Sequence, residues 1–325
     1  MASQTSSIAP ISTALVTGGA GFVGSHIARA LVEQGASVRV LDNLSTGRLG
    51  NLHDVSSEVD VRESDLRSPE AVAEAVRGVD TIFHQAALPS VPRSVKDPRT
   101  SLEVNVTGTL NVLIAARDAG VRRVVFASSS SIYGANPEMP KRESLVPEPI
   151  SPYAVGKLTA EGLCRSFSKV YGVETVALRY FNVFGPFQDP HSQYSAVIPL
   201  FISALLRGEA PLIHGDGEQS RDFTYIENVV RANVLASSAP DAAIGRAFNI
   251  ACGHRSTLNE LVAQIAAAVG TEPRSTYGPS REGDVPHSLA DISAARETLG
   301  YAPQVDLAEG LRRTVDHYSA ELARA

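Results

Sequence analysis

The sequence contains few cysteines and no long apolar run. Cys164 and Cys252 are the only cysteines among 325 residues, and two cysteines so far apart predict neither a disulfide framework nor a zinc site. Such sparse use of cysteine is typical of a reducing cytoplasm. No apolar stretch reaches the roughly 18 residues that a membrane-spanning helix needs. Residues 1–12 lack the basic start and the apolar core of a secretory signal, so we expect a flexible tail and a cytoplasmic protein without a membrane segment.

An excess of basic charge is also absent. The chain carries 29 Lys and Arg against 35 Asp and Glu, a net charge of −6, which excludes the basic footprint of a nucleic-acid-binding protein. Anionic small molecules are compatible with this balance, because helix N-termini and one or two arginines suffice to hold phosphate groups. Hydrophobic residues make up 43% and charged residues 20%, which is ordinary for a globular enzyme. No metal site is predicted.

Short apolar segments alternate with helical segments over the first 180 residues. Strands are predicted at Ala14–Thr17, Ser37–Asp42, Val59–Glu63, Thr81–His84, Arg123–Ser128 and Thr175–Arg179. Helices are predicted at Ser25–Gln34, Pro69–Arg77, Arg99–Ala119 and Tyr153–Tyr171. This alternation indicates βαβ units, and therefore an α/β fold with a doubly wound parallel sheet of the Rossmann type.

The alternation ends after Phe181, where Gly185-Pro186 and Asp189-Pro190 indicate a long loop. Further helices are predicted at Val197–Arg207, Glu227–Ser237, Thr257–Val269 and Asp306–Ala323. Because these helices are mixed with short strands, we predict a smaller, mixed α/β C-terminal cap on the first domain.

Three glycines, Gly18, Gly21 and Gly24, lie between the first strand and the first helix. This spacing allows a tight turn and lets backbone N–H groups approach a pyrophosphate at the helix N-terminus. A simple glycine-rich turn is the alternative, but the flanking strand and helix favour a dinucleotide site.

Two acidic residues follow neighbouring strands of the same domain. Asp42 ends the second strand, where a carboxylate suits the ribose hydroxyls of NAD and repels the additional phosphate of NADP. Arg48 lies close enough in the sequence to soften that preference. Asp65 follows the third strand with Leu66, and this pair could flank the adenine or simply lie at the surface.

Tyr153 and Lys157 are four residues apart and therefore share one face of a helix. A phenol has a pKa of about 10 and is a poor base, but a nearby ammonium favours the phenolate, so Tyr153 could exchange protons with a sugar or alcohol hydroxyl. Serines 128–131 end the fifth strand, at the edge where doubly wound sheets bind ligands. A solvated helix face and an ordinary serine loop are the alternatives. The order of glycine loop, serine run and Tyr–Lys pair makes the combination specific.

With these motifs the chain resembles the extended short-chain dehydrogenase/reductases and, within them, the UDP-sugar 4-epimerases. The similar segments extend over nearly the whole chain: Thr17–His26, Asp42–Gly47, Asn105–Thr109, the serine run, Ser151–Lys157, Arg179–Pro186, Gly215–Gly217, Arg221–Phe223 and Arg281–Asp284.

The resemblance implies a role for each matching position. Tyr153 would be the base and acid at the C4 hydroxyl, Lys157 would bind the nicotinamide ribose and lower the pKa of the tyrosine, and Ser129 and Ser130 would lie beside the reacting hydroxyl. Tightly bound NAD would contact Gly18, Gly21, Phe22, Val23, Gly24, Asp42, Asn43, Ser45, Thr46, Gly47, Asp65, Leu66, Gln85, Ala86, Ala87, Asn105, Ser128, Tyr153, Lys157, Tyr180 and Val183. The UDP-sugar would contact Ser90, Ser129, Tyr153, Asn182, Ala196, Val197, Arg221, Arg281, Asp284 and Ser288.

The resemblance also divides the chain into domains and implies an assembly. Residues 13–180 would form the NAD-binding domain, with later segments around 221–252 returning to it, and residues 181–325 would mainly bind the UDP-sugar. The helices Arg99–Ala119 and Tyr153–Tyr171 would pair across a two-fold axis, so a homodimer is expected.

The implied reaction is C4 epimerisation of a UDP-hexose through a transient 4-keto sugar. Related dehydratases carry an Asp-Glu pair, and related decarboxylases a Glu, where this chain has Ser130 and Ser131, so simple epimerisation is favoured. UDP-glucuronate 4-epimerases tend to have Thr at the position of Asn182, which favours a neutral hexose. That activity, a nucleotide-sugar reductase with net NAD(P)H turnover and a non-catalytic NAD-sensing relative are the alternatives.

The pocket wall indicates the range of sugars. Ser288 occupies a position where epimerases limited to UDP-glucose and UDP-galactose carry a bulky aromatic, and Ser90 resembles the segment of N-acetylhexosamine-active members. We therefore expect UDP-GlcNAc and UDP-GalNAc to be accepted as well as UDP-Glc and UDP-Gal. Phe187 departs from the family, where Arg is frequent, and removes one contact to the pyrophosphate or the loop.

Overall fold

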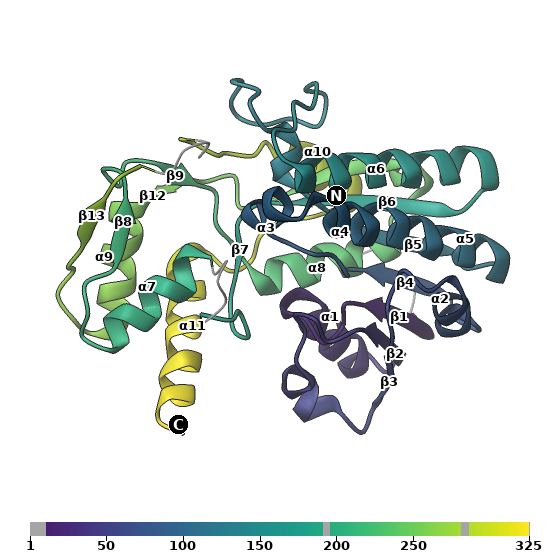
Figure 1. Cartoon of the computed structure of the whole chain (residues 1–325), viewed down its shortest axis with the longest axis horizontal. Helices are drawn as coiled ribbons and strands as arrows, with labels where there is room; N and C mark the ends of the chain where they lie inside the picture. The colour runs from purple at the N-terminus through teal and green to yellow at the C-terminus, as the bar shows by residue number, and fades with distance from the viewer. Residues whose placement is uncertain (1–10, 191–195, 281–285, 325) are drawn as a thin grey trace, which may run out of the picture.

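A seven-stranded parallel sheet forms the centre of the protein (Figure 1). The computed structural model describes residues 11–190, 196–280 and 286–324. The strands are β1 (Thr13–Thr17), β2 (Ser37–Asp42), β3 (Val59–Glu63), β4 (Thr81–His84), β5 (Arg123–Ser129), β6 (Glu174–Tyr180) and β11 (Arg246–Ile250). Their order is β11-β6-β5-β4-β1-β2-β3 and every pairing is parallel. The order reverses between β1 and β4, as in Rossmann folds, so the predicted fold class is confirmed.

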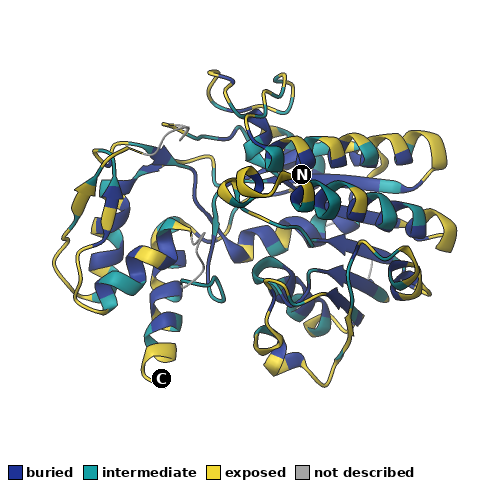
Figure 2. Cartoon of the chain, in the orientation of Figure 1, coloured by how far each residue is buried: buried dark blue, intermediate teal, exposed yellow. Residues whose placement is uncertain are grey.

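Helices cover both faces of the sheet, so its inner strands are largely apolar and buried, whereas the edge strand β3 is mostly exposed. One face is covered by α1 (Phe22–Glu33), α8 (Ile226–Ser237) and α10 (Ser293–Leu299), and the other by α2 (Pro69–Val76), α5 (Thr109–Ala119) and α6 (Pro152–Tyr171). Successive strand residues point to opposite faces, so Leu15 packs against the second layer and Val16 against the first, and both are fully buried. Figure 2 shows the buried sheet between helices whose outer surfaces are exposed.

Helix α6 carries the Tyr–Lys pair and has clear end signals. The Ser151 hydroxyl accepts a hydrogen bond from the backbone N–H of Ala154, and Pro152 occupies the first turn. Gly172 ends the helix in a left-handed conformation (φ 74°). Beside α6, the single helix predicted at Arg99–Ala119 consists of α4 (Pro98–Leu102), a π-helical segment η2 (Glu103–Gly108) and α5.

The later elements lie to one side of the sheet (Figure 1). They comprise α7 (Val197–Leu206), α9 (Leu258–Val269) and α11 (Leu307–Leu322), and three two-stranded sheets, β7 (Val183–Phe184) with β10 (Thr224–Tyr225), β9 (Ser220–Arg221) with β12 (Ser256–Thr257), and β8 (Leu212–His214) with β13 (Thr276–Gly278). The intervening α8 and β11 belong to the main sheet and its helical layers. The domain boundaries assigned from the sequence stay predictions.

Short helical segments complete the fold: η1 (Leu49–Val55), α3 (Val91–Lys96), η3 (Ser130–Tyr133) and η4 (Asp241–Ala243). No helix in the described ranges combines the length and the apolar character needed to cross a membrane.

Candidate active site

A cavity of about 360 Å³ lies at the carboxyl ends of β1, β2, β4 and β5, and the glycine loop forms its floor. Gly18 has a φ of +68°, and a Cβ atom there would lie 2.7 Å from the Cα of Ala86. A Cβ at Gly24 would lie 2.1 Å from the carbonyl oxygen of Gly18, so neither position admits a larger residue. Gly21 caps α1 without a side chain, which leaves the first N–H groups of the helix facing the cavity. This geometry suits a pyrophosphate.

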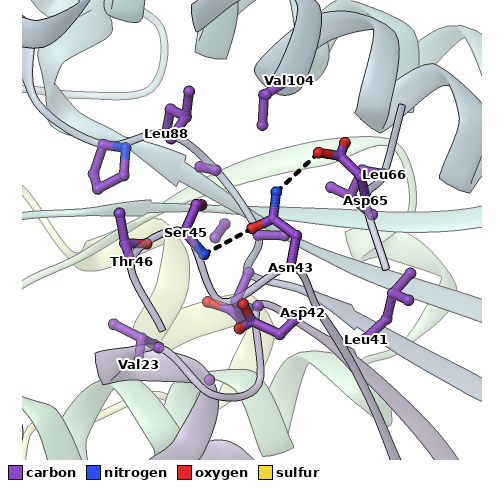
Figure 3. A pocket seen from close by; sticks show the side chains of 18 of the residues that line it. Val23, Leu41, Asp42, Asn43, Ser45, Thr46, Asp65, Leu66, Leu88 and Val104 are labelled. Carbon is purple, nitrogen blue, oxygen red and sulfur yellow. Dashed lines mark hydrogen bonds between the residues drawn. The ribbon is translucent and has the colours of Figure 1, made fainter. Parts of the chain in front are cut away.

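The carboxylate of Asp42 shapes the next wall of the cavity (Figure 3). Its oxygens accept hydrogen bonds from the backbone N–H groups of Ala20 (3.0 Å) and Leu44 (2.9 Å). Burial raises the pKa of Asp42, and these two hydrogen bonds oppose that shift. Each oxygen keeps a lone pair for a ribose hydroxyl, so Asp42 both fixes its loop and could bind a ligand.

Asp65 is held at the rim of the same cavity by two neighbours. The Asn43 amide donates to its carboxylate at 2.9 Å, and the Arg67 guanidinium contacts both oxygens at 3.0 and 2.9 Å. The hydrogen bond to Arg67 holds the pKa of Asp65 well below its usual range. Arg67 lines the cavity and was not predicted, although its place two residues after Asp65 could have indicated it. Arg48, by contrast, pairs with Asp189 at 2.5 Å.

Most residues predicted to bind the cofactor line this cavity. They are Gly18, Gly21, Phe22, Val23, Gly24, Asp42, Asn43, Ser45, Thr46, Asp65, Leu66, Gln85, Ala86, Ala87, Ser128, Tyr153, Lys157 and Tyr180. Sequence reasoning missed Leu41, Ser64, Arg67, Leu88, Pro89, Thr100, Val104 and Ala127, most of which adjoin a predicted residue in the chain.

Three predicted cofactor residues lie elsewhere. Gly47 lies against Asp42, where a Cβ would come within 2.8 Å of the carboxylate. Asn105 is buried in the π-helical segment, and its amide exchanges two hydrogen bonds with the backbone of Leu88, a residue of the cavity wall. Val183 lines a second cavity. Asn105 thus acts on the wall through Leu88 rather than by facing the cavity itself.

Tyr153 and Lys157 meet at the inner end of the first cavity. The buried Lys157 ammonium donates to the carbonyl oxygen of Ala127 at 2.8 Å and lies 5.9 Å from the centre of the Tyr153 ring. Burial lowers the pKa of Lys157 to about 8. Burial raises the pKa of Tyr153, and a hydrogen bond with Ser129 partly offsets this. Burial therefore moves the pKa of the phenol upward, opposite to the lowering by the ammonium that we expected.

The serine run joins β5 to η3. Ser128 lines the first cavity and donates to Glu161 at 2.5 Å. The Ser129 hydroxyl accepts from the backbone N–H of Ser131 at 3.2 Å, and Ser130 is half-buried at the start of η3. The Ser131 hydroxyl oxygen is buried and finds no hydrogen-bond partner among the described residues.

The second cavity, of about 250 Å³, begins just after Tyr180 of the first. Four residues predicted to bind the substrate line it: Asn182, Ala196, Val197 and Arg221. The Arg221 guanidinium donates to the carbonyl oxygen of Pro286 at 3.0 Å, and Asn182 donates to that of Asp222 at 3.0 Å. Sequence reasoning did not assign Phe184, Ile198, Leu200, Phe201, Leu212, His214, Gln219, Phe223 or Leu258 to the site.

The two specificity positions lie outside both cavities. Ser288 is half-buried, and its backbone N–H donates to the carbonyl oxygen of Ser220, next to Arg221. Ser90 caps α3 from a strained backbone with a φ of +96° and follows Pro89 of the cavity wall. The predicted substrate residues Arg281 and Asp284 lie outside the described residues.

Phe187 packs the loop after β7 onto two helices. Its ring lies 5.2 Å from that of His26 on α1 and 4.9 Å from that of His317 on α11, and the Arg29 guanidinium lies 5.1 Å from its centre. The aromatic side chain thus joins the sheet domain to the C-terminal part of the chain. Within the described residues, no group of three or more His, Cys, Asp or Glu side chains could hold a metal ion.

Known proteins share this architecture. The NAD dependent epimerase/dehydratase family matches residues 14–251. A UDP-glucose 4-epimerase of Mycolicibacterium smegmatis is 40% identical over 312 residues, which cover 94% of this chain and 97% of that protein. The structure of UDP-N-acetylglucosamine 4-epimerase from Methanobrevibacter ruminantium, in complex with UDP-N-acetylmuramic acid, is 40% identical with a TM-score of 0.91 and covers 96% of this chain and 100% of its own. The structure of UDP-glucose 4-epimerase from Thermus thermophilus in complex with NAD is 38% identical with a TM-score of 0.86. The similarity covers 94% of this chain and 99% of that chain. The chain belongs to the NAD-dependent epimerase/dehydratase family of extended short-chain dehydrogenase/reductases.

Proposed function

We propose that the protein is a UDP-hexose 4-epimerase that keeps NAD bound through its cycle. One observation carries the proposal: the Tyr153–Lys157 pair lies in the same cavity as the glycine loop and Asp42. The second cavity begins at Asn182, two residues after Tyr180 of the first cavity. It contains Arg221 and the N-terminus of α7, and this combination suits a diphosphate. The similar epimerases support the same function.

The residues of the chain would handle the protons of this reaction. Tyr153 takes the proton from the C4 hydroxyl and later returns it, and Ser129 hydrogen-bonds the phenol so that it can act in both directions. Lys157, fixed by the carbonyl oxygen of Ala127, presents a positive charge beside the ring. The nicotinamide of bound NAD supplies the acceptor and donor for the hydride at C4. The Arg221 side chain and the α7 N-terminus hold the nucleotide half while the keto sugar turns over.

The serines at the end of β5 favour epimerisation over elimination. Ser130 and Ser131 offer only hydroxyl groups, and a hydroxyl is too weak an acid to expel the C6 substituent of a hexose. Asp42 ends β2 and favours NAD over NADP, and Arg48 is engaged with Asp189. These contacts support NAD as the cofactor.

We further propose that the enzyme accepts both acetylated and non-acetylated UDP-hexoses. Ser288 has a short side chain and is attached by its backbone to the strand that carries Arg221. Ser288 does not line either cavity, but the family resemblance would place it beside the C2 substituent, where a small residue would leave space for an N-acetyl group. The relative from Methanobrevibacter ruminantium, named for UDP-N-acetylglucosamine, supports this range.

The proposed function is tested with purified protein and no added cofactor. We expect an absorbance spectrum showing bound NAD and interconversion of UDP-Glc with UDP-Gal and of UDP-GlcNAc with UDP-GalNAc. A requirement for stoichiometric NAD(P)H would instead identify a reductase, and turnover confined to UDP-glucuronate would identify the other epimerase class. Activity on the non-acetylated pair alone would refute the proposed sugar range.

Tyr153→Phe separates chemistry from binding. Because the ring remains and only the hydroxyl is lost, the variant should retain NAD yet lose about 10³-fold or more in kcat. Tyr171→Phe, at the half-exposed far end of the same helix, is the matched control and should be fully active. Wild-type activity in Tyr153→Phe would overturn the assigned mechanism.

A further inference from the structure

A buried ion pair lies directly behind the catalytic pair. Glu161 on α6 and Arg179 on β6 form two hydrogen bonds of 2.9 and 2.8 Å, and their side chains are 7% and 4% exposed. Glu161 also accepts the hydrogen bond from Ser128, a residue of the cofactor cavity. The pair thus reaches the wall of the site without facing the cavity itself.

The contacts continue away from the cavity. Arg179 donates to the Tyr133 hydroxyl at 2.8 Å, and that hydroxyl donates to the Asn249 side chain at 2.7 Å. The Asn249 amide then donates to the carbonyl oxygens of Lys141 and Asp291. Glu161 is therefore held rigidly, because both of its oxygens and its ion-pair partner are fixed.

Burying an ion pair removes two charges from water, and well-packed apolar residues would often be at least as stable. A contribution to the stability of the fold therefore explains poorly why Glu161 and Arg179 are charged. Their position is informative, because Glu161 lies one helical turn beyond Lys157 on the same helix, where side chains four residues apart are neighbours.

The other titratable groups facing Lys157 are neutral near pH 7. Tyr153 and Cys164 lie on α6, and burial raises the pKa of both well above neutrality. His84, at the end of β4, has a pKa lowered by burial to about 3. Cys164 and Glu161 both oppose the lowering of the Lys157 pKa by burial. Because the Cys164 thiol keeps its proton near pH 7, the ion-paired Glu161 is the one of these two groups that places a negative charge near Lys157.

We propose that Glu161 is a positioning residue for the catalytic pair: it fixes Ser128 at the end of β5 and places a negative charge beside Lys157 that keeps the ammonium protonated. The inference rests on the proposed function, since it concerns how that site works. It adds a residue that none of the sequence motifs assigned.

The protonation of Lys157 can be measured without turnover. The chain has only four lysines, Lys96, Lys141, Lys157 and Lys169, so NMR of the NAD-bound protein with 13C-labelled lysine gives four side-chain signals to follow with pH. Lys96→Arg, Lys141→Arg and Lys169→Arg assign them. We expect Glu161→Gln to lower the pKa of Lys157 by about one pH unit, because the compensating charge is lost.

Enzyme kinetics give a second readout. The alkaline decline of kcat should move to lower pH in Glu161→Gln, so that kcat falls about tenfold at pH 9 and much less at pH 6.5. Glu174→Gln is the matched control, because Glu174 pairs with the buried Arg123 at 2.7 Å at the opposite end of β5 and β6. It should lower the thermal midpoint without moving either pH profile.

A second variant keeps the inference testable if Glu161→Gln fails to fold. The double variant Glu161→Gln, Arg179→Gln leaves no unpaired buried charge and should fold. It should still lower the pKa of Lys157, by less than the single variant. An unchanged pKa of Lys157 in whichever variant folds would overturn the inference, even if stability falls. If the wild-type protein is inactive as an epimerase but the pKa of Lys157 falls in the variant as expected, only the proposed function is refuted.

Discussion

At the scale of single residues, we predict that Ser288 limits the size of the group that fits at C2 of the sugar. Its backbone is fixed by Ser220, so a larger side chain cannot move away freely. We expect Ser288→Tyr to lower kcat/KM for UDP-GlcNAc and UDP-GalNAc by about 10- to 100-fold and to change the values for UDP-Glc and UDP-Gal little. Kinetics on all four sugars check this, with Ser288→Ala as control. Equal losses for both pairs would show that residue 288 does not face the C2 substituent.

At the scale of elements, the turn from β1 to α1 permits close approach of backbone and ligand. A methyl group at Gly24 would overlap the carbonyl oxygen of Gly18, so Gly24→Ala must open the turn. We expect the purified variant to retain less than about a tenth of its NAD and to unfold at lower temperature. The control is Gly162→Ala in α6, where a Cβ meets nothing within 4 Å and a gain of up to about 1 kcal/mol in helix stability is expected. Normal NAD content in Gly24→Ala would contradict the structural assignment of the loop.

The junction of β1, β4 and α5 makes stability depend on pH. The buried His84 bonds Thr17 at 2.7 Å and Thr109 at 2.9 Å, and burial lowers its pKa to about 3. In the unfolded chain this histidine takes up a proton near pH 6.5, whereas in the folded chain it stays neutral down to about pH 3. The free energy of unfolding therefore falls by about 1.4 kcal/mol for each pH unit below 6.5. Thermal midpoints at pH 7 and pH 5 should fall further apart in the wild type than in His84→Gln. His26, whose pKa burial lowers to about 4, and Asp222, whose pKa burial raises to about 6, contribute equally to both proteins and do not alter this difference. Parallel slopes would refute the role of His84.

Local sequence patterns predicted most helices and strands, whereas features that depend on contacts between distant segments could not be predicted. The strands β2, β3 and β4 have the predicted bounds. In β2 and β4 most residues are buried, whereas β3 at the edge of the sheet is mostly exposed, and its alternation of Val with charged residues marks it instead. Strand β11 was not predicted, because it lies after Phe181, where the alternation of strands and helices in the sequence ends, and it joins the sheet beside β6. The indirect contact of Asn105 with Leu88 and the place of Glu161 behind Ser128 likewise leave no periodic signal. Residues that face the cavity were therefore easier to predict than residues that support it.

At the scale of the whole molecule, exposed apolar side chains on neighbouring helices suit the predicted homodimer. Val95 on α3 is 63% exposed and Val155 on α6 is 42% exposed, and these two helices contact each other. Light scattering of the wild type should give twice the chain mass of 34.4 kDa. Val155→Asp should shift the protein toward monomers, because a charge would have to be buried at the interface. NAD content should be retained, since Val155 is exposed and does not line the cofactor cavity.

The control for this interface is Leu322→Asp. Leu322 is 55% exposed at the end of α11, in the other part of the molecule, so its replacement tests whether any exposed apolar side chain has the same effect. The dimer should persist in that variant at all concentrations tested. A wild-type protein that stays monomeric at high concentration would refute the dimer, and dissociation by both variants would place the interface elsewhere. Each protomer has its own pair of cavities, so a monomer could be active. The activity per chain of the Val155→Asp monomer then measures whether the partner helps to position α6. Helix α6 carries Tyr153 and Lys157.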